Sequence, residues 1–372
     1  MRIFNEIGIH NLKGDLLGGV TAAIIALPMA HTFGVASGAG AQAGLYGAVL
    51  VGLFAALFGG TPTLISEPTG PMTVVFTAIV LSMMAPDPVT GLPPENGMAM
   101  AFTTVMLAGV FQVLFGVLKL GRYVTLMPYT VISGFMSGIG IILIALQLPG
   151  LLGHPTPPGG VVGSLEALPG LIGQLNSGEL VLGLGTLAIL FLMPRAWRRY
   201  VPPQLLALVV GSLAAVWLLG SGSYRAIGEI PGGLPSLQPP VFSTAEWRTI
   251  VIDALVLAML GAIDALLSAV IADSLTRKQH DSDKELVGQG LGNLASGLFG
   301  GLPGAGATMG TVVNIQTGGR TALSGLTRAL ILGVVVLGAG NLVEDIPKAV
   351  LAGIAIKVGF DIIDWGFLRR AH

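Results

Sequence analysis

Two carboxylates of this sequence lie in apolar surroundings, where a charge is costly. Asp264 stands in the middle of the run AMLGAIDALLSAV, and Glu67 stands beside the segment PTGP. A carboxylate at the bilayer centre costs about 2.5–3.5 kcal/mol on insertion scales, so it usually faces a cavity or a partner. We therefore expect Asp264 to be a proton or cation coupling site at the substrate pocket; the alternatives are a structural hydrogen bond to a neighbouring helix and a protonated residue without a role in transport. For Glu67, a coupling role and capping of a helix N-terminus are equally good interpretations.

The chemistry expected next to these acids is attraction of an anion. The segments Thr69–Val74 and Ala307–Val312 each follow a stretch rich in Gly and Pro. A half-helix that begins at membrane depth presents unpaired N–H groups and the positive end of its dipole. Two such ends facing each other would attract an anion without an arginine. Predicted substrate-binding residues at the two starts are Glu67, Thr69, Gly70, Ala307, Thr308, Met309, Gly310 and Thr311.

The composition indicates that the elements which carry these groups are membrane helices. Only 10% of the 372 residues are charged and 53% are hydrophobic, whereas soluble domains average about 25% charged residues. Apolar runs of about 20 residues are long enough to span a bilayer. Predicted spans cover residues 15–33, 42–59, 69–85, 98–118, 126–147, 178–194, 203–220, 249–273, 285–300, 307–317, 322–340 and 346–364. The chain is therefore expected to be an all-α polytopic membrane protein.

Two of these predicted spans are too short or too interrupted to be regular crossings. The third opens on EPTGP, and the tenth is the Gly-rich stretch PGAGATMGTVVNIQTGG. Irregular backbone at membrane depth is tolerated only where protein or water satisfies its polar groups. The preceding pieces Thr61–Ser66 and Leu302–Gly306 are expected to form short strands. The Pro- and Gly-rich stretches 148–177 and 221–248 are expected to be outer connecting loops.

Charges predict the orientation of the chain. With a cytoplasmic N-terminus, the predicted outer loops hold only Arg225 and Arg248, which follows the positive-inside rule. The basic residues of the predicted inner loops are Arg2, Lys13, Lys119, Arg122, Arg195, Arg198, Arg199, Arg277, Lys278, Lys284, Arg320, Arg369 and Arg370. Within spans, Arg328 and Lys357 are expected to form a salt bridge or to snorkel.

A net charge of −1 argues against nucleic acid as a partner. No cysteines and five scattered histidines argue against a metal site.

An internal repeat links the two interrupted spans. Residues 45–62, LYGAVLVGLFAALFGGTP, align without gaps with residues 286–303, LVGQGLGNLASGLFGGLP. The alternative is a chance match of apolar helices, but the shared LFGG-x-P ending disfavours it, and each copy precedes an interrupted span. The predicted topology places the copies in opposite orientations. Inverted repeats with interrupted helices at corresponding positions are typical of secondary transporters and point to the substrate site.

Several stretches resemble the sulfate permease (SulP) family of anion transporters along nearly the whole chain. They are DLLGGVTAAIIALPMA, AGLYGAVLVGLFAALFGG, ISEPTGPMTVVF, TVVNIQTGGRT and, most specifically, RKQHDSDKELVGQGLGNLASGLFGGLPGAGA. The resemblance implies two inverted seven-segment repeats, here about 14–221 and 249–372, and a core domain that moves against a gate domain. The substrate would lie between the half-helices of segments three and ten. The family pattern continues with two further segments and a STAS domain, so we expect a single transport domain over 1–372 with those parts missing.

The resemblance also assigns single positions. Asp264 matches a position where members commonly carry glutamate, which supports the coupling role. Met29, just after Pro28, matches a position where many members carry glutamine. Pro28 and Met29 are therefore also predicted to be substrate-binding residues. Glu67 stands where glycine is usual. Gly310 stands where many members carry an arginine thought to face the anion. A pocket of weak fixed positive charge would suit an organic acid taken up with protons.

We therefore expect a secondary active transporter of small anions or carboxylates, such as fumarate, sulfate or bicarbonate. Proton-coupled symport by alternating access of the core domain against the gate domain is the expected mechanism, with sodium as the other candidate coupling ion and no cofactor. The alternatives are a proton-coupled nucleobase transporter of the same fold and an uncoupled anion channel. An enzyme is not expected, because no nucleophile–base pair or metal-ligand cluster is visible. The resemblance further implies a homodimer, and the expected location is the bacterial cytoplasmic membrane.

Overall fold

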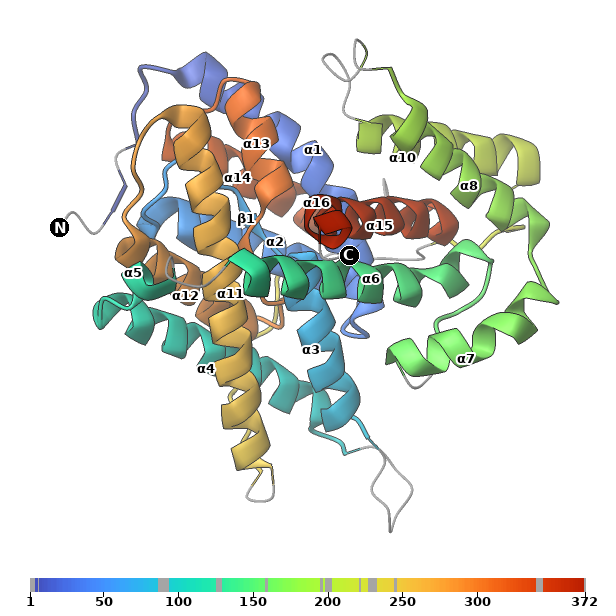
Figure 1. Cartoon of the computed structure of the whole chain (residues 1–372), viewed down its shortest axis with the longest axis horizontal. Helices are drawn as coiled ribbons and strands as arrows, with labels where there is room; N and C mark the ends of the chain where they lie inside the picture. Colours follow the sequence, from blue (N-terminus) through green and yellow to red (C-terminus); the bar gives the residue numbers. More distant parts are fainter. Residues whose placement is uncertain are drawn as a thin grey trace. The chain divides into compact units, whose positions relative to one another are not determined.

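The computed structural model describes residues 4, 5, 7–85, 94–124, 129–157, 160–194, 197, 203–220, 222–226, 233–243, 246–338 and 344–370. Helices dominate this part of the chain (Figure 1). The chain divides into two compact units, and each is discontinuous in sequence. Unit 1 comprises Met1–Met127 and Gly233–Leu337, and unit 2 comprises Pro128–Gly232 and Gly338–His372. Both predicted half-helices lie in unit 1.

Unit 1 is built from long helices around one small antiparallel sheet. Its elements are α1 (Leu12–Ala36), α2 (Ala41–Phe58), β1 (Ser66–Glu67), α3 (Gly70–Met83), α4 (Gly97–Val117), α5 (Gly121–Val124), α11 (Trp247–Thr276), α12 (Ser282–Leu298), β2 (Ala305–Gly306), α13 (Thr308–Gln316) and α14 (Ala322–Gly338). The half-helices α3 and α13 begin within one residue of their predicted starts. Each directly follows a strand, although the strands are only two residues long and shorter than predicted.

Unit 2 contains the other helices of the described residues, and one of them lies where a loop was predicted. Its elements are α6 (Tyr129–Leu151), α7 (Gly160–Ile172), α8 (Ser177–Leu192), α10 (Pro203–Ala214), η1 (Ala215–Leu219), α15 (Lys348–Ile362) and α16 (Trp365–Arg370). The stretch 148–177, predicted to be a loop, holds the helix α7. Its Gly and Pro content suggested a loop, but Val161, Leu165 and Leu168 recur at helical spacing, and that periodicity decides the local structure.

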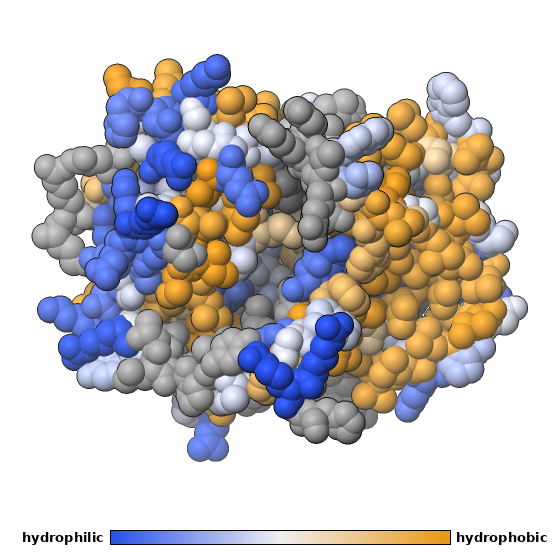
Figure 2. Space-filling model, turned by 45° about the horizontal axis from the view of Figure 1, so that its top comes forward, coloured by the Kyte–Doolittle hydropathy of each residue, from blue (hydrophilic) through white to orange (hydrophobic). Residues whose placement is uncertain are grey.

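Each of the twelve predicted spans contains a helix. By length and composition, α2, α4 and residues Trp247–Asp273 of α11 could each cross a membrane alone. The helices α7 and α8, which meet at a bend of 119°, could together form a fourth span. Large apolar side chains such as Val181, Leu192 and Leu218 are exposed, at 65%, 78% and 77% of their surface. Figure 2 shows broad apolar areas on the face in view, as expected for surfaces that contact lipid.

The repeat detected in the sequence has a structural counterpart in α2 and α12. Gly47 of α2 and Gly288 of α12 are equivalent in the alignment. A Cβ on Gly47 would lie 2.6 Å from the carbonyl oxygen of Leu302, in the loop after α12. A Cβ on Gly288 would lie 2.5 Å from the backbone nitrogen of Gly59, in the loop after α2. Each copy therefore packs against the loop that follows the other, which is the reciprocal contact of a two-fold arrangement.

The two strands extend this relation to the half-helices. Ser66 pairs with Gly306 and Glu67 with Ala305 in an antiparallel register. Because the strands run in opposite directions, the chain leaves them in opposite directions to enter α3 and α13. The alignment of the repeats and the antiparallel strands thus support the predicted inverted organisation.

Candidate functional site

The helix α11 brings the predicted coupling residue into contact with one half-helix. Asp264 is buried, and its Oδ2 accepts a hydrogen bond of 2.7 Å from Oγ1 of Thr69. Thr69 is the N-cap residue of α3 and has extended backbone, with φ −106° and ψ 160°. Its hydroxyl bonds Asp264 and makes no capping bond to its own helix. The carboxylate is thereby held at the start of α3.

The next turn of α11 contacts the other half-helix. Ser268 is four residues after Asp264, so both side chains lie on the same face of the helix. The Oγ of Ser268 donates to the carbonyl oxygen of Gly306 at 2.7 Å and lies 2.8 Å from Oγ1 of Thr308. Gly306 ends β2, and Thr308 begins α13. One face of α11 therefore holds the starts of both half-helices.

These contacts place several oxygens together beside the two helix starts. They are the carboxylate of Asp264, the hydroxyls of Thr69, Ser268 and Thr308, and the carbonyl of Gly306. Oxygen donors of this kind suit hard cations. The adjacent helix N-termini carry partial positive charge and free N–H groups, which suit an anion. The site combines features that fit a cation with features that fit an anion.

The remaining predicted residues of α13 differ in their surroundings. Thr308 and Met309 are exposed on unit 1, whereas Gly310 and Thr311 are buried. The Oγ1 of Thr311 accepts a hydrogen bond of 3.0 Å from the backbone nitrogen of Ile65, so it anchors the approach to β1. The backbone nitrogen of Ala307 donates to the carbonyl oxygen of Ile65 at 2.7 Å. Thr308 and the first N–H groups of α13 are thus the parts best placed to meet a ligand.

On the α3 side, Gly70 and Pro71 open the helix. Gly70 is its first residue, and Pro71 occupies the first turn, where a missing N–H removes no intrahelical bond. Met29 is a partly buried residue of α1, while the side chain of Pro28 lies outside the described part of that helix. Sequence reasoning placed both near the substrate, and for these two residues that remains a prediction.

Glu67 is held by a buried cation. Its Oε2 accepts a charge-assisted hydrogen bond from Nη2 of Arg328, and both side chains are buried. The Nη1 of Arg328 also donates to the carbonyl oxygens of Ser66, at 3.0 Å, and Ala48, at 3.2 Å. The salt bridge expected as one alternative for Arg328 is therefore present. The carboxylate of Glu67 bonds this arginine rather than the N–H groups of α3, so the capping interpretation was wrong.

A second polar cluster fixes the loop that leads into β2. The amide of Asn293 donates to the carbonyl oxygen of Gly304 at 2.9 Å and accepts from its nitrogen at 2.7 Å. The same amide donates to Oε1 of Gln112 at 2.8 Å, and Gln112 donates to the carbonyl oxygen of Ala258 on α11. All three helices α4, α11 and α12 are thus tied to the strand that positions α13.

Sequence reasoning named Asp264, Thr69 and the two helix starts, but it missed Ser268 and Asn293 and did not name the partner of Arg328. Ser268 had a detectable signal, because it lies one turn from Asp264 on the same helix face. Arg328 was noticed, but nothing in the sequence pointed to Glu67 as its partner. Asn293 stands within the repeat, opposite Gly52 of the first copy, so the repeat gave no sign of its role.

The site can now be compared with known proteins. A model described as the sulfate permease family matches residues 12–372. The bicarbonate transporter BicA of Synechocystis sp. is 65% identical over 372 residues, and that of Picosynechococcus sp. is 63% identical over 374 residues. Both alignments cover 100% of this chain but 65% of the relative, so the chain spans somewhat less than two thirds of their length.

A solved structure gives the same result at the level of the fold. The transmembrane domain of a cyanobacterial bicarbonate transporter BicA superimposes with a TM-score of 0.93 and 64% sequence identity. The match covers 99% of this chain and 93% of that structure. The arrangement of half-helices described above is therefore set within a known transporter fold.

Proposed function

The chain belongs to the sulfate permease family, and from this we propose that it is a secondary active transporter of a small oxyanion, with bicarbonate as the substrate. The observation that carries the proposal is the pair of contacts made by α11, Asp264 with Thr69 and Ser268 with Thr308. They join α11, which carries the carboxylate, to the N-termini of both half-helices. The two relatives that are 63–65% identical are named bicarbonate transporters, which favours this anion over the sulfate and fumarate also expected from the sequence.

The coupling ion in this proposal is sodium, bound at Asp264. An unpaired carboxylate would repel an anion bound at the nearby helix starts, and the repulsion is strong where water is scarce. A cation at Asp264 removes that repulsion, so the anion binds well only with the cation. The hydroxyls of Thr69, Ser268 and Thr308 and the carbonyl of Gly306 offer Na⁺ the oxygen ligands that a bare proton does not require.

Alternating access is the proposed transport mechanism. Unit 1 carries the half-helices and would be the core domain, while unit 2 would be the gate domain. The proposal also includes a bacterial cytoplasmic membrane location, a cytoplasmic N-terminus and a homodimer. In support of the orientation, Nζ of Lys284, a residue of a predicted inner loop, donates to Asn5 of the N-terminal segment at 2.7 Å.

Reconstituted protein tests the proposal. Liposomes containing the purified chain would be given labelled bicarbonate under an inward Na⁺ gradient, with choline replacing Na⁺ in the control and a proton gradient imposed separately. Unlabelled bicarbonate, sulfate, fumarate and chloride would be added as competitors, and labelled uracil would be offered in a separate uptake assay. We expect uptake that requires Na⁺ and is inhibited by bicarbonate itself.

Other outcomes would contradict separate parts of the proposal. Uptake driven by the proton gradient without Na⁺ would overturn the choice of ion alone. Transport of uracil without any anion would identify a nucleobase carrier. Bicarbonate flux that never accumulates against its gradient would identify a channel.

A further inference from the structure

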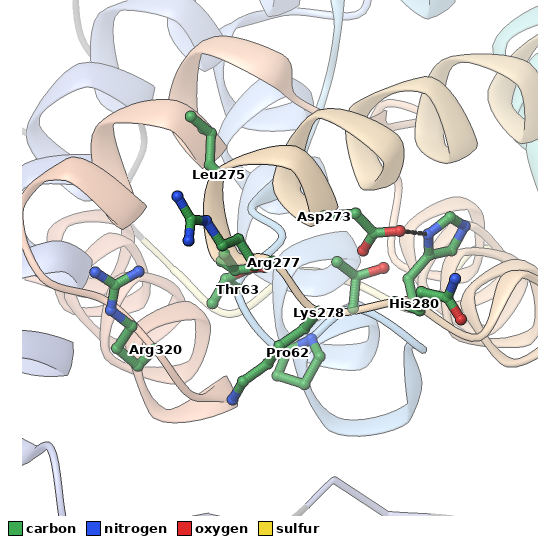
Figure 3. A pocket seen from close by; sticks show the side chains of 11 residues that line it. Pro62, Thr63, Asp273, Leu275, Arg277, Lys278, His280 and Arg320 are labelled. Carbon is green, nitrogen blue, oxygen red and sulfur yellow. Dashed lines mark hydrogen bonds and ion pairs between the residues drawn. The ribbon is translucent and has the colours of Figure 1, made fainter.

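Unit 1 contains a cavity away from the half-helix starts, where α11 ends (Figure 3). Its volume is about 340 Å³. Three separate segments line it: residues 61–63 after α2, residues between 273 and 280 at the end of α11, and Arg320 between α13 and α14. The apolar span of α11 ends at Asp273, so the cavity lies where this helix leaves the apolar region.

The lining of this cavity is positively charged. Arg277, Lys278 and Arg320 contribute exposed side chains, and no carboxylate of the described residues forms an ion pair with them. The acidic residue of the lining is Asp273, and its Oδ2 lies 2.7 Å from Nδ1 of His280. Figure 3 shows this pair on the opposite side of the cavity from the guanidinium groups of Arg277 and Arg320.

The backbone that carries the two arginines is anchored. Arg277 ends α11 in the left-handed conformation, with φ 57°, and its nitrogen donates to the carbonyl oxygen of Asp273 at 2.7 Å. The nitrogen of Arg320 donates to Oδ1 of Asp15 at 2.7 Å, and Asp15 also accepts from the nitrogen and hydroxyl of Thr321. A binding site gains affinity when the residues that form it are held in advance.

A neighbouring cavity extends the basic surface towards the N-terminal segment. It has a volume of about 640 Å³ and shares Pro62, Lys278 and Arg320 with the first. It adds Lys284 and His10 to the lining. Together the two cavities present several cations around one shared wall, with room for a ligand larger than a single ion.

We propose that this basic cavity binds a phosphate group. Guanidinium groups form paired charge-assisted hydrogen bonds with phosphate oxygens, and a dianionic phosphate matches a cluster of three cations that form no ion pair with the carboxylates of the described residues. The group would belong either to a soluble phosphate compound or to a lipid headgroup, because basic residues just beyond a membrane span attract anionic headgroups. This site is distinct from Asp264 and the half-helix starts, so it would act on the transporter without being the transport site.

Binding to the purified chain tests this inference. Inorganic phosphate would be titrated calorimetrically in detergent at constant ionic strength, with chloride as the reference anion. In parallel, thermal unfolding would be compared in nanodiscs of phosphatidylglycerol and of phosphatidylcholine. The variants are Arg277→Gln, Arg320→Gln and their combination. The matched control is Lys119→Gln, because Lys119 is another exposed cation that follows a helix of unit 1 with φ 57°.

If the ligand is a soluble phosphate, we expect the combined variant to weaken the apparent affinity for phosphate by at least about 10-fold. If the ligand is a lipid headgroup, we expect the combined variant to lose the thermal stabilisation by phosphatidylglycerol. Lys119→Gln should bind as the unaltered chain does, and all variants should unfold at similar temperatures in chloride. Phosphate binding alone identifies a soluble ligand, and stabilisation by the anionic lipid alone identifies a headgroup.

Three results would overturn the inference. The first is that neither phosphate nor phosphatidylglycerol differs from its reference. The second is that the combined variant behaves like the unaltered chain. The third is loss of phosphate binding in Asp264→Asn, which would place the phosphate at the transport site. Because bicarbonate uptake is not the readout, failure here leaves the proposed function untouched.

Discussion

The hydroxyl of Thr69 donates a hydrogen bond of 2.7 Å to the carboxylate of Asp264, across 195 positions of the sequence. Thr69 is the N-cap of a half-helix, and its side chain serves the acid of a neighbouring helix instead of its own N–H groups. This bond ties the proposed cation site to the proposed anion site. Any change at one of them is therefore expected to alter the other.

Removal of the charge at residue 264 should abolish coupling. Asp264→Asn keeps an oxygen that can accept from Thr69 but cannot balance a cation. We expect Na⁺-driven bicarbonate uptake to fall and the apparent affinity for Na⁺ to weaken by at least about 10-fold. Uptake at a series of Na⁺ concentrations measures this effect. Asp253→Asn, on the same helix but outside the contacts described for the site, is the matched control and should retain Na⁺-driven uptake.

Loss of the hydroxyl at residue 69 should leave the acid without its partner. A hydrogen bond to a charged group contributes roughly 1.5–3 kcal/mol, so Thr69→Val should lower stability by about that amount and reduce uptake. Thr69→Ser keeps the hydroxyl and should behave nearly as the unaltered chain. Thermal unfolding in detergent and liposome uptake measure the two effects. Equal behaviour of the Val and Ser variants would contradict the prediction.

Substitutions of Glu67 and Arg328 should have non-additive effects on the free energy of unfolding. Removal of one partner leaves a buried charge uncompensated, so Glu67→Gln or Arg328→Met alone should lower the free energy of unfolding by about 3–5 kcal/mol. The combined variant should regain much of this loss, because no buried charge remains. Unfolding temperatures of the single and combined variants form the test. The control is Lys357→Gln, which breaks a less buried pair with Asp361 and should cost less than about 1 kcal/mol.

The loop before β2 should not tolerate a side chain at Gly304. A Cβ there would lie 2.6 Å from the carbonyl oxygen of Glu67, which is closer than real contacts allow. Gly304→Ala should therefore separate the two strands and destabilise the protein by about 1–3 kcal/mol. Gly333→Ala in α14 is the control, because its Cβ would meet Val49 at an ordinary 3.9 Å. Helix propensity should make that variant equally or slightly more stable. Unfolding temperatures of both variants decide the prediction.

Much of the fold could be predicted because its signals are local. Apolar length placed a helix in all twelve expected ranges, and the Gly- and Pro-rich punctuation placed the starts of α3 and α13 within one residue. The helix α7 was missed because Gly and Pro were given more weight than apolar periodicity. The shared LFGG-x-P ending predicted the equivalence of α2 and α12, which the reciprocal contacts of Gly47 and Gly288 support.

The candidate site was predicted only in part. Its main residues could be named because a carboxylate in an apolar run is conspicuous. Their partners could not, because a hydrogen-bond partner is chosen by distance in space. Ser268 carries no unusual signal until α13 is seen beside it, and Asn293 becomes important only through the loop at Gly304.

The residues alone identify a membrane protein with an inverted repeat, two interrupted helices and two carboxylates in apolar surroundings. Hydrophobic length and backbone-breaking residues are properties of short segments, so they can be read without coordinates. The partners of these acids are set by the fold: Glu67 pairs with Arg328, 261 positions away, while Asp264 bonds Thr69. Two acids that looked alike in the sequence thus differ in their partners, and a buried carboxylate takes its properties from the group that the fold places against it.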